Sequence, residues 1–167
     1  MSVVKYIAFI CIAFSMAACE SRSEKYDIDI IQGIISSVKY GWKTGDETPF
    51  REHFLDYEGG RYIETGEQNT GLTDLIETHL KVEHELVEYL VLEFLDVDVT
   101  IDGDFAWAVV DTRLKVRIRQ SGQMIDRKGY QTFLFKQISG TWKVIHTHSS
   151  SRTETDISLF RLDKPDA

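Results

Sequence analysis

Cysteine is almost absent from this chain, and its placement excludes several kinds of chemistry. The only two cysteines among the 167 residues are Cys11 and Cys19, both close to the N-terminus. The sequence after Cys19 can therefore form no disulfide, supply no cysteine nucleophile and offer no thiolate to a metal ion. A domain of this kind can fold in an oxidising compartment without help from redox enzymes.

Clusters of basic residues are also absent. Residues 19–167 contain 18 Lys and Arg against 27 Asp and Glu, a formal charge of −9, because residues 1–18 contribute only Lys5. Nucleic-acid binding depends on clustered cations that neutralise phosphates, so we expect no nucleic-acid partner. Hydrophobic residues make up 43% of the chain and charged residues 28%, which is enough for the core of one globular domain.

The N-terminus has the pattern of a secretory signal peptide. Lys5 precedes an apolar run over residues 6–18, which is too short to span a bilayer comfortably. The sequence MAAC at positions 16–19 resembles the lipobox of bacterial lipoproteins, which implies cleavage before Cys19 and diacylation of that residue. The alternative is an ordinary signal peptide cleaved near Ala18.

The lipoprotein interpretation divides the chain into four parts. They are a signal peptide at 1–18, the lipidated Cys19 with a polar tether at 19–25, a domain at 26–153 and a C-terminal tail at 154–167. The protein would then lie in the bacterial cell envelope, anchored to a membrane through the lipid. In a host with an outer membrane, a Glu after the Cys resembles the pattern of lipoproteins sorted to that membrane or its periplasmic face.

Three helices are predicted in the first half of the domain. Apolar residues at three- and four-residue spacing predict the first over about 26–45. Thr48 as N-cap and Pro49 in the first turn predict the second, and a broad apolar stripe predicts the third from about Leu72. A brief extended segment at 61–66 separates the second helix from the third.

The second half of the chain changes to the alternating pattern of β-strands. Short turn sequences separate four predicted strands, at 89–101, 105–119, 123–138 and 141–150. Short turns make neighbouring strands antiparallel. Helices followed by such a meander predict an α+β fold in which the helices cover one face of the sheet.

The strand at 105–119 has one apolar row, which should face the helices, and one row that begins apolar and becomes charged. The outward row predicts a homodimer interface made by Phe105, Trp107, Val109 and Arg113. The alternative is that the C-terminal tail covers this patch. In the strand at 89–101, apolar residues change from even to odd positions after Phe94, which predicts a β-bulge.

The last strand ends in polar groups that alternate along the chain. An extended chain points alternate residues to the same side, so the residues of one row share a face. That row is Trp142, Val144, His146, His148, Ser150 and Arg152. Because the row begins with core residues, its polar end is predicted to line a pocket. The predicted ligand-binding residues are His146, His148, Ser150, Arg152 and, from the third helix, His79.

Three roles stay open for the histidines of this strand. His146 and His148 could be structural residues of the cavity wall, or they could contact a ligand together with Arg152. They could also hold zinc with His79 as a third ligand. His79 lies on the apolar stripe of its helix, where a buried, hydrogen-bonded histidine is common. We expect no metal ion and no cofactor as part of the site.

Three stretches carry a family resemblance. The sequences WKTGD at 42–46, GDFAWAVV at 103–110 and GTWKVIHTHSS at 140–150 resemble SnoaL-like members of the NTF2-like superfamily, over about residues 26–152. The last stretch also resembles the ending of the association domain of the multifunctional calcium/calmodulin-dependent protein kinase. The resemblance implies a cone-shaped, cystatin-like α+β barrel, dimers that pack through the outer sheet face, and a cavity for small organic molecules.

The sequence departs from the kinase branch in its cavity. Phe133 and Ser149 stand where that relative has arginines, which implies a less cationic cavity. The isomerases of the superfamily use a carboxylate base opposite hydroxyl donors. The candidate bases are Asp96, Asp98 and Asp126, and the candidate donors are Tyr26, Tyr40 and Tyr130. Their spacing singles out no pair.

The function expected from these features is binding of a small organic molecule by an envelope lipoprotein. One alternative is an isomerase, cyclase or hydratase that uses His148 or a cavity carboxylate as its acid–base group. The other is a dimeric scaffold without catalytic activity.

Overall fold

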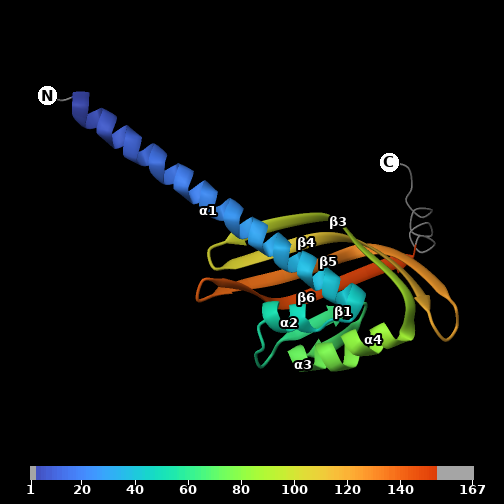
Figure 1. The fold of residues 1–167 in the computed structure, drawn as a ribbon. Coiled ribbons are helices and arrows are strands. Elements are labelled where there is room, and N and C mark those ends of the chain that lie inside the picture. The colour runs from blue at the N-terminus through green and yellow to red at the C-terminus, as the bar shows by residue number, and fades with distance from the viewer. Residues whose placement is uncertain (1–2, 154–167) are drawn as a thin grey trace, which may run out of the picture.

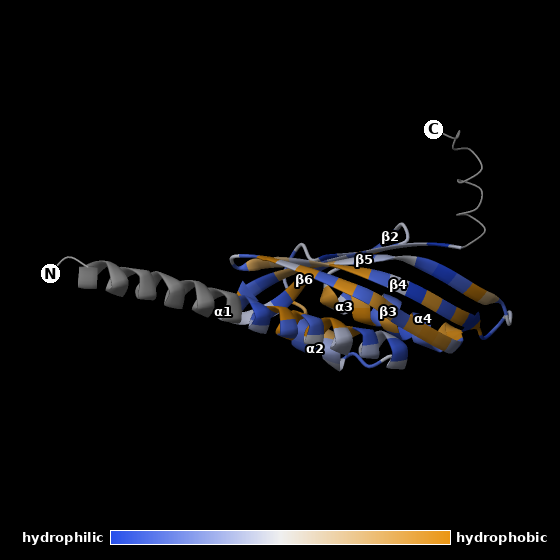
Figure 2. Ribbon diagram, turned by 90° about the horizontal axis from the view of Figure 1, so that it is seen from above, coloured by the Kyte–Doolittle hydropathy of each residue, from blue (hydrophilic) through white to orange (hydrophobic). Residues whose placement is uncertain are grey.

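The computed structural model describes the backbone of residues 3–153 and the side chains of residues 24–153. The predicted C-terminal tail at 154–167 lies outside the described residues. Over the described residues the fold consists of four α-helices, one π-helical segment and a six-stranded sheet, and the helices lie on one face of the sheet (Figures 1 and 2). No helix in the described part of the chain combines the length and the apolarity needed to cross a membrane.

Helix α1, Val3–Thr44, is longer than the helix predicted at 26–45. It contains no proline, and its first glycine is Gly33, so nothing in residues 19–25 interrupts helical backbone. The expected helix start near Tyr26 is therefore wrong. The C-terminal part of α1 lies across the sheet and buries Ile31, Ile35 and Val38, whereas its N-terminal part projects beyond the sheet (Figure 1).

Helix α2, Thr48–His53, confirms the second predicted helix but not its cap. Its N-cap is Glu47, and Thr48 is already helical and donates its N–H to Asp46 Oδ1 at 2.9 Å. Pro49 lies in the first turn as predicted, because a residue there needs no N–H donor.

The third predicted helix consists of three successive segments. They are α3, Leu72–Asp74, the π-helical segment η1, Leu75–Leu80, and α4, Lys81–Leu86. The predicted stripe is buried in this region at Leu75, Ile76 and Leu80, as expected for an amphipathic helix on a core. π-Helical turns are rare and occur frequently at functional sites, and this one contains His79.

The sheet is mixed, not entirely antiparallel as predicted. Its strands are β1, Arg61–Glu64; β2, Glu67–Thr70; β3, Val87–Asp102; β4, Phe105–Ile118; β5, Met124–Ile138; and β6, Thr141–Thr153. Their order is β2-β1-β6-β5-β4-β3, and β1 runs parallel to β6. The four long strands form the predicted antiparallel meander, whereas β2 and the parallel contact were not predicted.

The core lies between the helices and the inner face of the meander. In β4 the row that contains Ala106, Ala108 and Val110 is buried, as predicted, and alternating polar and apolar bands mark the strands in Figure 2. On β5 the core residues are Phe133 and Phe135, with no exposed surface.

Strand β3 contains the predicted bulge. Its pairing with β4 shifts between Phe94 and Asp96, so Leu95 is an extra residue and its side chain is exposed. Beyond the bulge the inward residues are Val97 and Val99, on odd positions. A bulge bends the strand, which lets the long sheet curve over the helices.

Candidate functional site

A cavity of about 420 Å³ lies between the helical segment 72–86 and the inner face of the sheet. One wall is apolar and comes from the three strands farthest from β1. Its main members are Leu90, Leu92, Leu114, Val116, Ile118 and Ile125. The rest of the lining is more polar and includes Glu64, His79, Glu83, Gln131, Ser149 and Ser151. A volume of this size suits a small organic molecule.

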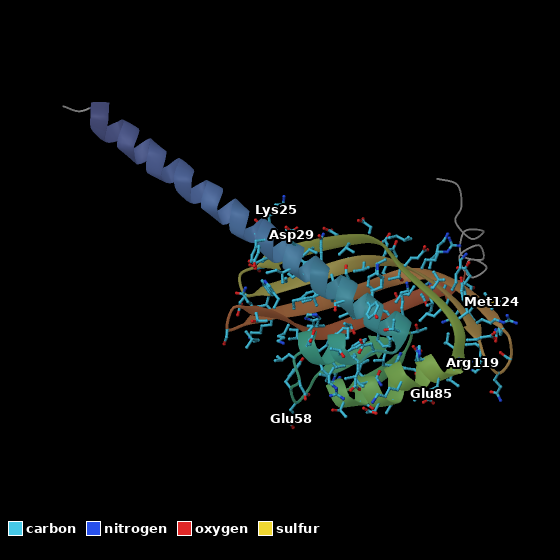
Figure 3. All side chains as sticks on the ribbon, in the orientation of Figure 1. Lys25, Asp29, Glu58, Glu85, Arg119 and Met124 are labelled. Atoms are coloured by element: carbon cyan, nitrogen blue, oxygen red, sulfur yellow. The ribbon has the colours of Figure 1, made fainter. Side chains whose placement is uncertain are left out.

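One end of the cavity is held by Arg119, which lies just after β4. Its guanidinium donates to the carbonyl oxygens of Glu85 at 3.2 Å and Val87 at 2.8 Å, which ties β4 to the junction of α4 and β3 (Figure 3). Leu86 and Val87 from this junction line the cavity, so the contact fixes the apolar end of its wall.

Another bulge, in β6, decides which residues of the last strand reach the cavity. Phe135 pairs with Val144 and Leu134 pairs with His146, so Ile145 is an extra residue in the ladder. Val144 and Thr147 are both buried, three positions apart, which uninterrupted alternation would not allow. The inward residues after the bulge are therefore those on odd positions.

The predicted cavity row of β6 is consequently wrong. None of its polar members, His146, His148, Ser150 and Arg152, lines the cavity, and the last three are exposed. His146 lies beside β1, where its Nδ1 is 2.7 Å from the carbonyl oxygen of Arg61.

The row that does reach the cavity contains Ser149 and Ser151. Thr147, two residues before Ser149 in the same row, is buried. These serines belong to the row assigned to the other face by simple alternation.

His79 is the one predicted site residue that lines the cavity. Its side chain is 8% exposed and packs edge-on against Trp42, with ring centroids 5.3 Å apart. Its Nδ1 lies 3.0 Å from Asn69 Oδ1 on β2.

The orientation of the Asn69 amide shows that His79 Nδ1 carries a proton in either charge state of the ring. Asn69 Nδ2 donates to Thr78 Oγ1 at 3.1 Å, and the Thr78 hydroxyl in turn bonds to the carbonyl and carboxylate of Asp74. Asn69 Oδ1 is therefore the atom that faces the ring, so Nδ1–H donates a hydrogen bond to it. Nε2 is left to face the cavity.

Two carboxylates lie next to His79 Nε2. Glu64 Oε2 from β1 is 3.1 Å away and Glu83 Oε2 from α4 is 3.4 Å away. Burial alone would lower the pKa of His79, but the two carboxylates outweigh it and raise the pKa to about 10. In the metal-free protein at neutral pH the ring is therefore an imidazolium that faces two glutamates.

Sequence reasoning did not identify Glu64 or Glu83 as site residues. A signal existed for Glu83, because it lies four residues after His79, a spacing that places side chains on one helix face. For Glu64 there was none, since only the parallel pairing of β1 with β6 brings it to the cavity.

The other acid–base candidates are not brought together. Asp96 and Asp98 are exposed, and Asp126 forms ion pairs with Arg113 at 3.1 Å and Lys115 at 3.4 Å outside the cavity. The candidate donors Tyr26, Tyr40 and Tyr130 are all more than half exposed and do not line the cavity.

The predicted dimer patch lies on the outer face of the sheet. Phe105, Trp107 and Val109 are 45%, 41% and 39% exposed, and Leu134 on the neighbouring strand extends the patch. Arg113 is farther along β4, where its guanidinium binds Asp126 through two contacts. The patch is thus an apolar surface with a paired charge beyond one end.

Comparison with known proteins gives the same fold. The structure is similar to an NTF2-like superfamily protein from Salmonella enterica serovar Typhimurium LT2, with a TM-score of 0.69 and 18% identity over 76% of this chain and 92% of that one. It is also similar to a cystatin-like protein from Caulobacter vibrioides, with a TM-score of 0.67 and 20% identity over 81% and 96%.

An enzyme has a similar structure too. The hexachlorocyclohexane dehydrochlorinase from Novosphingobium barchaimii LL02 gives a TM-score of 0.68 with 13% identity, over 77% of this chain and 88% of that one. Likenesses at these identities show the fold alone. No curated protein matches the chain.

The SnoaL-like domain family matches residues 42–154. This range includes the helical segments from α2 to α4 and all six strands. All residues that line the cavity lie within this match, including Trp42, Glu64, His79, Glu83 and Ser149. The chain therefore belongs to the SnoaL-like family, with the cystatin-like α+β fold of the NTF2-like superfamily.

Proposed function

We propose that the protein binds a small, mainly apolar organic molecule in its cavity. The observation that carries the proposal is the contrast between the walls of the cavity, one of aliphatic side chains and one of polar groups. Such walls bury the apolar part of a ligand and orient it through few hydrogen bonds. Phe133 and Trp142 belong to the core and do not fill the space.

The charges on the cavity wall favour a neutral or cationic ligand. Glu64, Glu67 and Glu83 line it, against the imidazolium of His79 and the guanidinium of Arg127. A carboxylate ligand would meet net repulsion at the Glu64–Glu83 end. An amine or hydroxyl group that donates hydrogen bonds would be stabilised there.

Adjacent serines of β6 provide a test of the binding function. Ser149→Trp should fill part of the cavity and weaken binding of a neutral apolar fluorophore, N-phenyl-1-naphthylamine, by about tenfold or more, since lost burial of a few methylene-sized groups costs about 1–3 kcal/mol. Ser150→Trp places the same group on the outer face and should leave the affinity unchanged. Fluorescence titration measures both constants.

Two results would contradict the proposal. One is an absence of saturable fluorophore binding by the unmodified protein, and the other is an equal loss of affinity in both tryptophan variants. Native mass spectrometry of the protein purified from its host should also reveal a co-purifying molecule, and Ser149→Trp should abolish it.

An acid–base enzyme is the second candidate, and His79 is the group that favours it. Its Nδ1–H donates to Asn69 Oδ1, which orients the ring, and Nε2 lies beside two carboxylates in the cavity lining. His148, the acid–base group considered from the sequence, is exposed outside the cavity. An enzyme would convert the co-purifying molecule on incubation, and Asn69→Leu would slow the conversion.

We propose further that the outer patch forms a homodimer. Phe105, Trp107 and Val109 expose a continuous apolar surface on β4 that polar residues flank. Trp107→Asp should shift the protein to monomer in sedimentation velocity at micromolar concentration. Tyr40→Asp, at an exposed site on α1, should leave the dimer intact. A monomeric unmodified protein would exclude the dimer.

Location in the cell envelope is likewise a proposal, supported by the MAAC sequence at 16–19. We infer that Cys19 is the lipidated N-terminus of the mature protein and that its lipid anchors the domain to a membrane. The mass of the N-terminal peptide from protein isolated from its host checks this directly.

A further inference from the structure

Three potential metal ligands meet at one place in the cavity wall. Glu64 comes from β1, His79 from η1 and Glu83 from α4, and one ligand atom of each lies within 4.8 Å of the others. All three residues line the cavity. Three separate elements within residues 61–86 thus place one imidazole and two carboxylates around a single point.

The position of His79 Nε2 suggests more than an ion pair. The side chain is 8% exposed, and Nε2 has no partner in hydrogen-bond geometry among the described residues. Both glutamate oxygens are nevertheless within 3.4 Å of it. Neither oxygen therefore has the position of a hydrogen-bond acceptor for Nε2.

We propose that Glu64, His79 and Glu83 bind a divalent transition-metal ion, and that Zn²⁺ suits these ligands. Nitrogen and carboxylate ligands lie about 2.0–2.2 Å from such an ion, so neighbouring ligands at tetrahedral or octahedral angles are about 3.0–3.4 Å apart. The separations of 3.1 and 3.4 Å from Nε2 to the two oxygens fall in this range.

The surroundings of His79 match those of a metal-binding histidine. Such residues donate their second ring N–H to a fixed acceptor, which orients the ring and leaves the other nitrogen for the ion. Asn69 Oδ1 is that acceptor here, held by Thr78 and Asp74. On binding, the ion displaces a proton from Nε2, and the two carboxylates balance its charge.

The site has room for an ion to enter and for a further ligand to bind. The Glu64 and Glu83 side chains are 39% and 54% exposed, so both can rotate toward an incoming ion. Three protein ligands leave at least one coordination position for a further ligand, and all three residues line the cavity. The metal site does not depend on the organic ligand proposed above and can be tested without it.

The test uses the full-length protein purified without a polyhistidine tag and treated with EDTA, which is then removed. Calorimetric titration with ZnCl₂ should show saturable binding of a single ion per chain. Glu64→Gln and Glu83→Gln should each weaken it at least about tenfold, since each removes a charged ligand. Glu85→Gln, an exposed change on the same helix as Glu83 and outside the cavity lining, should leave the affinity unchanged.

Titration with CoCl₂ gives a second measurement, because bound Co²⁺ has visible absorption bands that report nitrogen and oxygen ligands. The bands should appear with the unmodified protein and be lost in the Glu64→Gln/Glu83→Gln double variant, whose fold is checked by circular dichroism. The proposal is overturned if no saturable Zn²⁺ binding occurs up to about 1 mM. It is also overturned if binding persists unchanged in the folded double variant.

Discussion

Phe133→Ala should destabilise the folded protein by about 3–5 kcal/mol, whereas Leu134→Ala should cost about 1 kcal/mol or less. The two residues are adjacent on β5 and face opposite sides of the sheet. Phe133 has no exposed surface, and its ring centroid lies 6.0 Å from that of Phe135 and 6.4 Å from that of Phe94. Truncation leaves a cavity that these rings cannot fill. Leu134 is 38% exposed, so truncation there removes less buried surface.

Urea denaturation followed by circular dichroism measures both changes, with the unmodified protein as reference. Similar losses of stability in the two variants would mean that β5 does not present these faces as described. The result also bears on the site. Phe133, which the sequence resemblance places at a pocket arginine of the kinase association domain, packs in the core and does not line the cavity.

Alternation predicted the faces of the strands well wherever apolar residues marked them. In β4 the inward row was read directly from the sequence, because its apolar residues stay in phase over the strand. In β3 the phase changes after Phe94, and that change predicted the bulge that the pairing with β4 confirms. In these strands the face that a residue occupies depends on burial in the core, so the hydrophobic pattern of the sequence predicts it.

The last strand shows where this reasoning fails. Val144 and Ile145 are adjacent and both apolar, which was the only sign of a bulge, and the residues that follow are polar in both rows. The row with His146 and His148 and the row with Thr147 and Ser149 are both polar, so either could face solvent or line a polar cavity. The single extra residue therefore reversed the assignment of His148 and Ser149 without any loss of hydrophobic pattern.

The glutamates of the site illustrate a different limit. Glu83 could have been placed beside His79 from helical spacing, but Glu64 could not. Its strand β1 has only four residues, too few for a periodic signal, and its parallel pairing with β6 joins segments about half the chain apart. Contacts of this kind depend on the tertiary path of the chain and not on local sequence.

Stability should fall as the pH rises from about 6.5 to 10 because His79 is a paired imidazolium in the folded protein. Its pKa is about 10 when folded, against 6.5 for an ordinary histidine. A raised pKa means that the folded state binds a proton more tightly than the unfolded state. The stabilisation is therefore complete below pH 6.5 and is lost progressively as the pH approaches 10. The limiting slope is about 1.4 kcal/mol per pH unit.

The groups that face His79 determine how much of that slope is observed. Glu64 and Glu83 carry the opposing charges, Asn69 Oδ1 accepts a hydrogen bond from Nδ1–H, and Asp74 adds negative charge behind Asn69. Because both glutamates are partly exposed, solvent screens the pairs, and we expect a total loss of a few kcal/mol, below the limiting value.

Urea denaturation at several pH values between 6.5 and 9.5, with EDTA present to exclude metal ions, measures this dependence. The Glu64→Gln/Glu83→Gln double variant should be nearly independent of pH over the same interval, because its His79 has no carboxylate partner and is neutral in the folded state. Glu85→Gln should keep the slope of the unmodified protein, since Glu85 lies on α4 outside the cavity lining. Equal slopes in the unmodified protein and the double variant would show that the pH dependence arises at other groups. They would also exclude a His79 imidazolium held by these two glutamates.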